Sequence, residues 1–202
     1  MAGEGLVVVV SAPSGAGKTT LCRQVVERNR DCVFSVSVTT RPRRGQEQDG
    51  QDYHFTTEAD FKRMIEKKEL AEWAVVHDEY YGTTRAQLQT ETAQGRTVIL
   101  DIDVQGGIQI KQQFPNAVMI FILPPTFEEL KQRLVKRRTE SDAQIAQRMT
   151  TSRKELAQVS AYSYVIVNDD LAGAVAEFES IIQAEKCRLP RRKKIIQQFT
   201  TI

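Results

Sequence analysis

Ala12-Pro13-Ser14-Gly15-Ala16-Gly17-Lys18-Thr19 directly follows the apolar run Leu6-Val7-Val8-Val9-Val10. A β-branched run of this kind is typical of a buried strand, and residues 19–26 have the apolar spacing of a helix. The glycine-rich segment therefore joins a strand to a helix N-terminus, where outward-pointing N–H groups and the helix dipole favour a bound anion. The segment is predicted to be a phosphate-binding loop.

Each position of this loop has a physical role. Gly15 and Gly17 permit positive φ and a close approach of the backbone to phosphates. Lys18 is expected to reach the outer phosphates, and the Thr19 hydroxyl is placed to hold Mg²⁺. Ala12 stands where the first glycine of such loops usually lies, and its methyl group is expected to carry a mild cost. The alternative is an ordinary βα turn with a solvated lysine.

Composition bounds the class of protein. The chain has 202 residues, 27% of them charged and 41% apolar, which describes one globular domain. Its 28 Lys and Arg against 26 Asp and Glu give a net charge of +2, so no nucleic-acid partner is expected. Cys22, Cys32 and Cys187 lack metal-ligand spacing and read as free thiols. With no signal-peptide pattern and no apolar run of membrane-spanning length, we expect a cytoplasmic enzyme without a membrane partner.

Further apolar runs predict the rest of the fold. Strands are expected at 33–38, 98–102, 118–123 and 164–167, with helical spacing at 127–134 and 174–182. This alternation predicts an α/β fold, a parallel sheet covered by helices on both faces. Ligands bind such sheets beyond the carboxyl ends of the strands, where Lys18, Ser37, Asp101 and Asn168 follow or close apolar runs.

Two polar segments interrupt the alternation. We expect a single domain over residues 1–202, with a core made of 1–36, 97–136 and 161–202. The segment 37–96 is interpreted as an acceptor-binding insertion, and the arginine-rich segment 137–160 as a lid.

A second anion site is indicated by Ser37-Val38-Thr39-Thr40-Arg41-Pro42-Arg43-Arg44, which leads from a strand into a loop rich in guanidinium groups. Arginine binds phosphate through two hydrogen bonds and keeps its charge. Tyr53, Tyr80 and Tyr81 add possible hydroxyl donors. The alternative is a solvated basic loop.

Glu72 is a candidate for recognising a nucleotide base through hydrogen bonds. A glutamate can accept hydrogen bonds from the two adjacent N–H donors of guanine, and hydroxyls such as those of Ser37 and Thr83 can donate to its carbonyl. Adenine would leave these groups unpaired. A surface carboxylate is the alternative interpretation.

Over nearly its full length the chain resembles the guanylate kinase family, whose fold is that of the P-loop NTPases. The matching stretches are Phe34-Ser35-Val36-Ser37-Val38-Thr39-Thr40-Arg41, Gly50-Gln51-Asp52-Tyr53-His54-Phe55, Glu72-Trp73-Ala74, Tyr80-Tyr81-Gly82-Thr83, Leu100-Asp101-Ile102-Asp103-Val104-Gln105-Gly106 and Ile166-Val167-Asn168-Asp169. The resemblance implies that Arg41, Arg44, Tyr53 and Tyr81 hold the GMP phosphate. It implies that Ser37, Glu72, Thr83 and Asp103 read the guanine, and Asp101 is counted with this GMP-binding set.

One departure affects the arginines. In Arg41-Pro42-Arg43-Arg44-Gly45-Gln46-Glu47 the proline and glycine stand one place earlier than in the family pattern. Because Tyr53 lies at the expected distance from Arg44, Arg44 is aligned with the phosphate-binding arginine, although Arg43 stays an alternative.

The ATP-binding residues are predicted from the same resemblance and from the phosphate-binding loop. The predicted ATP-binding residues are Ala12, Pro13, Ser14, Gly15, Ala16, Gly17, Lys18, Thr19, Thr20, Arg133, Arg137 and Asn168, the last of these near the adenine. Asp101, which closes an apolar strand, is expected to hold Mg²⁺ together with Thr19, unless it is only a turn residue.

Phosphoryl transfer needs aligned reactants and positive charge on the moving group. The predicted catalytic residues are Lys18, Arg41, Arg137 and Arg148, and no nucleophile or general base is required. Taken singly, the arginines of the helical segments also fit a solvated helix face. Arg138 stands where the family more often has glycine, which puts hinge behaviour of the lid in question.

The leading hypothesis is ATP-dependent phosphorylation of GMP and dGMP, by a monomer or homodimer. One alternative is a kinase of another small phosphorylated acceptor, such as a ribose bisphosphate. Another is a non-catalytic guanylate kinase-like module that binds peptides, which the intact Gly17-Lys18-Thr19 disfavours. A GTPase is disfavoured because no Asn-Lys-x-Asp motif accompanies Asp103-Val104-Gln105-Gly106.

Overall fold

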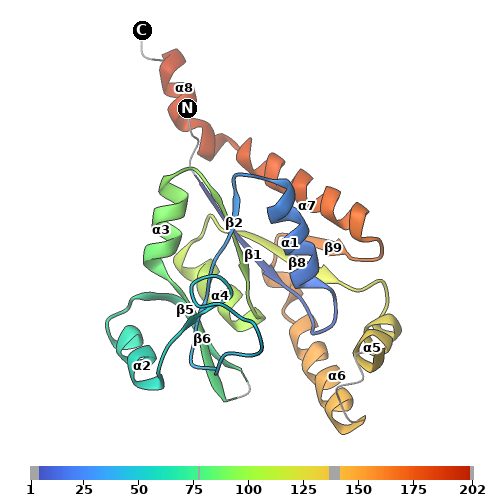
Figure 1. Ribbon diagram of the computed structural model, residues 1–202. Helices are drawn as coiled ribbons and strands as arrows, with labels where there is room; N and C mark the ends of the chain where they lie inside the picture. The colour runs from blue at the N-terminus through green and yellow to red at the C-terminus, as the bar shows by residue number, and fades with distance from the viewer. Residues whose placement is uncertain (1–4, 77, 137–141, 201–202) are drawn as a thin grey trace.

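The computed structural model of the chain describes residues 5–76, 78–136 and 142–200. Its centre is a five-stranded sheet in the order β2-β7-β1-β8-β9, and every recorded strand pair in it is parallel (Figure 1). The strands are β1 (Leu6–Ser11), β2 (Cys32–Phe34), β7 (Thr97–Asp101), β8 (Val118–Leu123) and β9 (Tyr164–Val167). The predicted parallel α/β fold is thereby confirmed.

Helices pack on both faces of this sheet, and alternate residues of a strand point to opposite faces. Val8 and Val10 of β1 pack in a cluster with residues of α1 (Lys18–Arg28) and α7 (Leu171–Lys186). Val7 and Val9 pack on the other face with residues of α3 (Arg85–Ala93) and α4 (Val104–Gln113). The carboxyl ends of β1 and β7 meet at one edge, with Val10 and Asp101 side by side in the register.

A second, four-stranded sheet has the order β4-β3-β6-β5. Its strands are β3 (Val38–Thr39), β4 (His54–Phe55), β5 (Leu70–Val76) and β6 (Glu79–Thr84). The pair β3 and β4 is parallel, whereas β6 pairs antiparallel with both β3 and β5. Helix α2 (Glu58–Glu66) covers this sheet with Phe61, which is fully buried beside Val38 and Leu70.

The prediction of one strand over residues 33–38 is wrong. β2 ends at Phe34 beside β7, and β3 begins at Val38 in the second sheet. The N–H of Ser35 still donates to Ile99 O at 2.9 Å, whereas Ser37 O accepts from His54 N at 2.9 Å. The chain changes partners within three residues, and alternating apolar and polar residues suit both strands equally.

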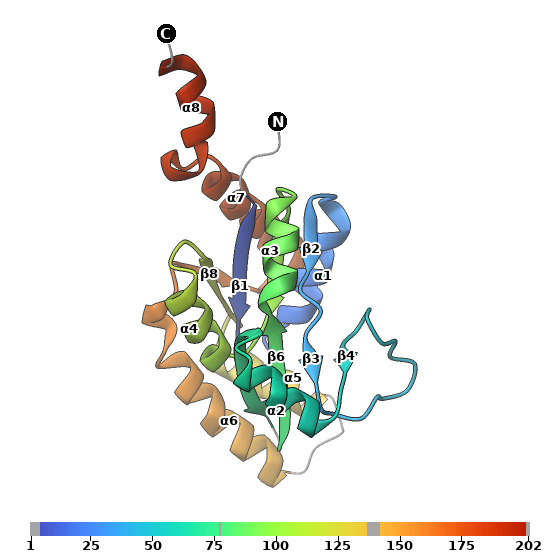
Figure 2. The same cartoon turned by 90° about the vertical axis from the view of Figure 1, so that its left-hand side faces the viewer.

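The remaining helices are α5 (Phe127–Lys136), α6 (Asp142–Leu156), the 3₁₀ turns η1 (Val159–Ala161) and η2 (Leu189–Arg192), and α8 (Lys193–Thr200). The predicted helices over 127–134 and 174–182 lie within α5 and α7. Helix α8 extends away from the rest of the molecule (Figure 2). Among the described residues, none of the helices is both long enough and apolar enough to span a membrane.

Candidate active site

The glycine-rich loop wraps around a cavity of about 300 Å³ at the N-terminus of α1. Gly15 and Gly17 have φ of 97° and 88°, conformations that favour glycine. Ala12 is not in the left-handed region and is only 7% exposed, so its methyl group is accommodated in the core. The cavity is lined by Ala12, Pro13, Ser14, Gly15, Ala16, Gly17, Lys18, Thr19, Thr20, Asp103 and Glu155.

Lys18 and Thr19 are both tied to the carboxyl end of β7. Lys18 Nζ lies 2.8 Å from Asp101 Oδ1 and donates to Ile102 O at 2.8 Å. Thr19 Oγ1 donates to Asp101 Oδ2 at 2.6 Å. A hydroxyl and a carboxylate are the oxygen ligands that Mg²⁺ prefers, and Mg²⁺ usually completes its shell with phosphates and water. The donor pair Thr19 and Asp101 therefore fits the expected ion.

Asn168 contacts the glycine-rich loop directly, and Arg133 contacts Asn168. Asn168 Nδ2 donates to Ala16 O at 2.8 Å, and a Cβ on Gly17 would lie 2.3 Å from that same nitrogen. Arg133 pairs with Glu129 at 3.0 Å and donates to Asn168 O at 3.2 Å. Neither Asn168 nor Arg133 lines the loop cavity. The predicted site residue Arg137 lies outside the described residues, as does Arg138.

Helix α6 brings two charged groups to the loop. Arg148 Nη1 donates to Ser14 Oγ at 2.6 Å. Glu155 lines the loop cavity, and burial raises the pKa of its carboxyl group. Its Oε2 is buried without a hydrogen-bond partner among the residues that the structure describes. Glu155 was not predicted from the sequence, because the residues around it are typical of a solvated helix face.

A second cavity of about 250 Å³ lies between the two sheets. Six of the predicted acceptor residues line it, and they come from β5, β6, β7 and the segments that follow β2, β3 and β7. The full lining is Ser37, Tyr53, Glu72, Ala74, Val76, Tyr81, Asp101, Ile102 and Asp103. Thr83 is fully buried opposite Glu72, while Arg41 and Arg44 lie outside this lining.

Glu72 is the most strongly perturbed carboxyl group of this cavity. It is 4% exposed, and burial raises its pKa to about 7. The Asp103 carboxylate adds to the increase, whereas the neighbouring Thr83 opposes it. The space that Glu72 occupies depends on Gly106, since a Cβ at that position would lie 2.5 Å from Glu72 Oε2.

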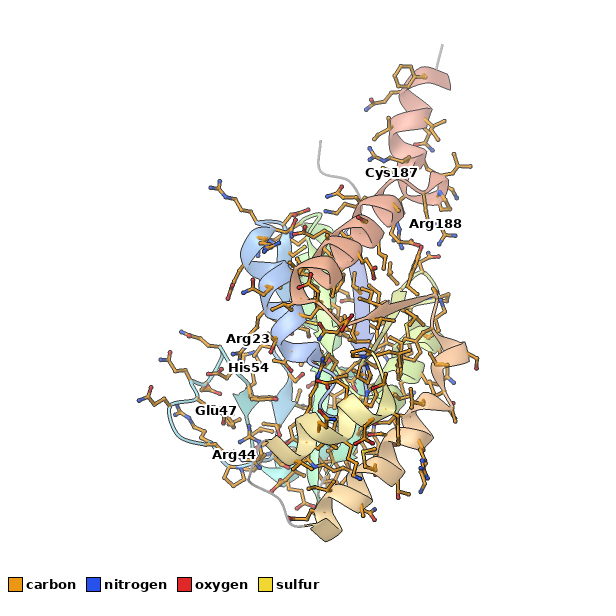
Figure 3. The ribbon with its side chains drawn as sticks, turned by 90° about the vertical axis from the view of Figure 1, so that its right-hand side faces the viewer. Arg23, Arg44, Glu47, His54, Cys187 and Arg188 are labelled. Atoms are coloured by element: carbon orange, nitrogen blue, oxygen red, sulfur yellow. The ribbon has the colours of Figure 1, made fainter. Side chains whose placement is uncertain are left out.

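Glu47 holds together the loop between β3 and β4, which contains Arg41, Arg43 and Arg44. No role was predicted for Glu47 from the sequence. Its carboxylate forms a salt bridge with Arg41 at 2.8 Å. Arg43 donates through its guanidinium to the carbonyl oxygen of Glu47 and lies over the Phe55 ring. Within the described part of the chain no hydrogen bond is recorded for the Arg44 guanidinium, and Figure 3 shows Arg44 on the outside of the loop.

The two cavities adjoin at the end of β7. Asp103 lines both of them, and Lys18 in the first cavity pairs with Asp101 in the second. Asp103 is also the N-cap of α4, where its Oδ1 accepts from Gly106 N at 2.9 Å. Its position is therefore fixed by backbone geometry.

A parallel sheet, a glycine loop between β1 and α1, and Lys18-Thr19 at the start of the helix define a P-loop nucleotide-binding protein. A sequence profile described as guanylate kinase matches residues 4–185. The chain belongs to the guanylate kinase family.

Relatives and a solved structure agree with this assignment. The chain is 47% identical over 192 residues to a guanylate kinase of Caldanaerobacter subterraneus subsp. tengcongensis, covering 95% of this chain and 93% of that protein. It is 52% identical over 188 residues to one of Syntrophotalea carbinolica, covering 93% and 90%. The crystal structure of guanylate kinase from Anaplasma phagocytophilum superimposes with a TM-score of 0.77 at 33% identity, covering 94% of this chain and 90% of that one.

Proposed function

We propose that this chain transfers the γ-phosphoryl group of ATP to GMP, and to dGMP, to give the corresponding diphosphate. The observation that supports this most directly is the pair of adjoining cavities that share Asp103. One is lined by a phosphate-binding loop and the other by a buried glutamate and tyrosines. Two nucleotides bound in this way present their phosphates to each other across the end of β7, which is the arrangement that phosphoryl transfer needs.

On the donor side, the loop from Ala12 to Thr20 cradles the phosphates of ATP with its backbone N–H groups. Lys18 turns from Asp101 towards the outer phosphates, and Arg148 from Ser14 towards the transferred group. Mg²⁺ bound with ATP would be held by Thr19 and Asp101, and it would neutralise charge on the phosphate oxygens.

On the acceptor side, Glu72 accepts the two guanine N–H donors, and Ser37, Thr83 and Asp103 complete the recognition of the base. Arg41, Arg44, Tyr53 and Tyr81 hold the acceptor phosphate. We assign this phosphate to Arg44 in preference to Arg43, because Arg43 already donates to Glu47 O. Closure of residues 37–96 and α6 over the nucleotides would exclude water from the transfer.

Neither of the alternatives raised by the sequence fits the site as well. A ribose bisphosphate has no base, and it would leave the buried Glu72 without donors to accept. A non-catalytic binding module would not need the salt bridge that joins Lys18 to Asp101 beside Thr19. Both observations favour the nucleotide kinase.

The test is a coupled ADP-release assay of the purified chain against GMP, dGMP, AMP, CMP and UMP. Turnover with GMP and dGMP, and little with the others, is the expected result. Lys18→Ala should abolish turnover with GMP binding retained, and Glu72→Ala should weaken GMP binding. Equal use of all five monophosphates, or guanine selectivity that survives Glu72→Ala, would contradict the proposal.

A further inference from the structure

Glu47 lies in the loop between β3 and β4 (Figure 3), where its carboxylate makes several polar contacts. Its Oε1 accepts from Arg41 Nη2 at 2.8 Å, and its Oε2 accepts from Arg41 Nη1 at 3.0 Å. The same Oε2 accepts the backbone N–H of Arg44 at 2.8 Å. One carboxylate therefore contacts both arginines to which the acceptor phosphate is assigned.

These contacts occupy a particular edge of the Arg41 guanidinium. A guanidinium carries five N–H donors and can bind an anion through its end, formed by Nη1 and Nη2, or through its side, formed by Nε and Nη2. Glu47 takes the end, and the second Nη1 proton goes to Pro42 O at 2.8 Å. Among the described residues no carboxylate is recorded on the side edge, formed by Nε and Nη2, so this is the edge open to a second anion.

Arg41 has little room to turn this edge elsewhere. The residue is 6% exposed, and its guanidinium carbon lies 5.2 Å from the centre of the Tyr53 ring and 5.9 Å from that of Phe55. Hydrogen bonding to Glu47 raises the pKa of Arg41. Tyr53 and Tyr81 both line the acceptor cavity. Arg41 is thus held beside the cavity in one orientation.

Glu47 itself is fixed from several directions. Its N–H donates to Arg44 O at 3.1 Å, its carbonyl oxygen accepts from Arg43 Nε at 3.1 Å, and its carboxylate is held as described above. A side chain anchored in this way is suited to staying in place when the acceptor phosphate binds. If the Glu47 carboxylate instead occupied the phosphate position, it would have to move away before the phosphate could bind.

We propose that Glu47 is a positioning residue for the acceptor phosphate. It fixes the end of the Arg41 guanidinium so that the side edge points to the phosphate, and it holds the Arg44 backbone in the same turn. This inference rests on the proposed function, because it concerns the phosphate of the proposed acceptor. The opposite view is that Glu47 imitates the phosphate and competes with it, and this view predicts tighter GMP binding when the carboxylate is removed.

The experiment compares wild type, Glu47→Gln, Glu47→Asp and the control Glu66→Gln by calorimetric titration with GMP and with guanosine. Glu66 is exposed at the end of α2 and has no recorded contact with Arg41, so its variant removes one negative charge without touching that guanidinium. Guanosine carries the base without the phosphate. Thermal unfolding of each variant is recorded in parallel, and wild-type turnover of GMP is measured on the same preparation.

We expect Glu47→Gln to raise the Kd of GMP about tenfold or more, as the loss of a charge-assisted contact implies, with the Kd of guanosine unchanged. Glu47→Asp should recover part of the loss, and Glu66→Gln should bind both ligands like wild type. Unchanged or tighter GMP binding by Glu47→Gln, or equal weakening for GMP and guanosine, would overturn the positioning role. Absence of wild-type turnover would count against the proposed function, whereas an active wild type confines a negative result to Glu47.

Discussion

Replacing Glu72 by glutamine should stabilise the protein when no nucleotide is bound. The side chain is 4% exposed, and burial, with a smaller contribution from Asp103, raises its pKa from 4.5 to about 7. Such a change corresponds to about 3 kcal/mol of unfavourable free energy for the ionised carboxylate in the folded state. Glutamine has nearly the same shape and never ionises, so the variant avoids this cost.

The sign of the pH dependence follows from which state holds the proton more tightly. Well below the unfolded pKa of 4.5, Glu72 is protonated in both states and contributes no penalty. Between 4.5 and about 7 the unfolded chain loses the proton first, so stability falls as the pH rises. Above about 7 the carboxylate is ionised in both states and the full cost is present.

Urea denaturation of wild type and Glu72→Gln across this pH range measures the effect. The difference in free energy of unfolding should be small near pH 4.5 and grow to about 3 kcal/mol in favour of the variant above about pH 7. Glu66→Gln, at an exposed position, is the matched control and should follow wild type. Parallel pH profiles for wild type and Glu72→Gln would refute the reasoning.

Three further substitutions test other parts of the site. Gly106→Ala places a Cβ 2.5 Å from Glu72 Oε2, so it should raise the KM for GMP while the KM for ATP stays near that of wild type, as steady-state kinetics would show. Arg148→Ala removes the guanidinium that contacts Ser14 Oγ at 2.6 Å and should lower kcat about a thousandfold, as for other arginines that stabilise a transferring phosphoryl group; a change below tenfold in stopped-flow turnover would argue against a catalytic role. Lys18→Met should lower kcat at least about a hundredfold and leave the Kd of GMP, measured by calorimetry, nearly unchanged.

The features that could be predicted from the sequence are those that depend on the spacing of residues close together in the chain. The strand from Leu6, the glycine loop and the helix from Lys18 occupy consecutive residues, and their order fixes their relative placement. Apolar runs predicted β1, β7 and β8 because a strand buried on both faces has to be apolar throughout, and a fourth apolar run predicted β9, although Val165 and Val167 of β9 are exposed. The mutual approach of Thr19 and Asp101 was likewise predictable, since carboxyl ends of parallel strands share an edge.

Features that depend on distant partners could not be predicted. The division of residues 33–38 between two sheets is set by Ile99 and His54, which the alternation of that segment does not encode. Glu155 faces the loop cavity only because α6 crosses it, and its own neighbours in sequence are ordinary charged residues. The hydrogen bond from the Asn168 amide to Ala16 O was not predicted either, while its place near the adenine stays a prediction.

The two ends of the proposed acceptor are treated in opposite ways by the folded protein. At the base end, Glu72 is buried without a salt bridge among the described residues, so a ligand that supplies two N–H donors relieves an existing cost. At the phosphate end, the charge of Arg41 is already balanced by Glu47, so binding of the phosphate relieves no unpaired charge. Discrimination between acceptors should therefore arise mainly at the base, while the phosphate end orients the acceptor phosphate for transfer. A kinase gains from this division, because a phosphate held too strongly in the ground state would slow transfer and product release.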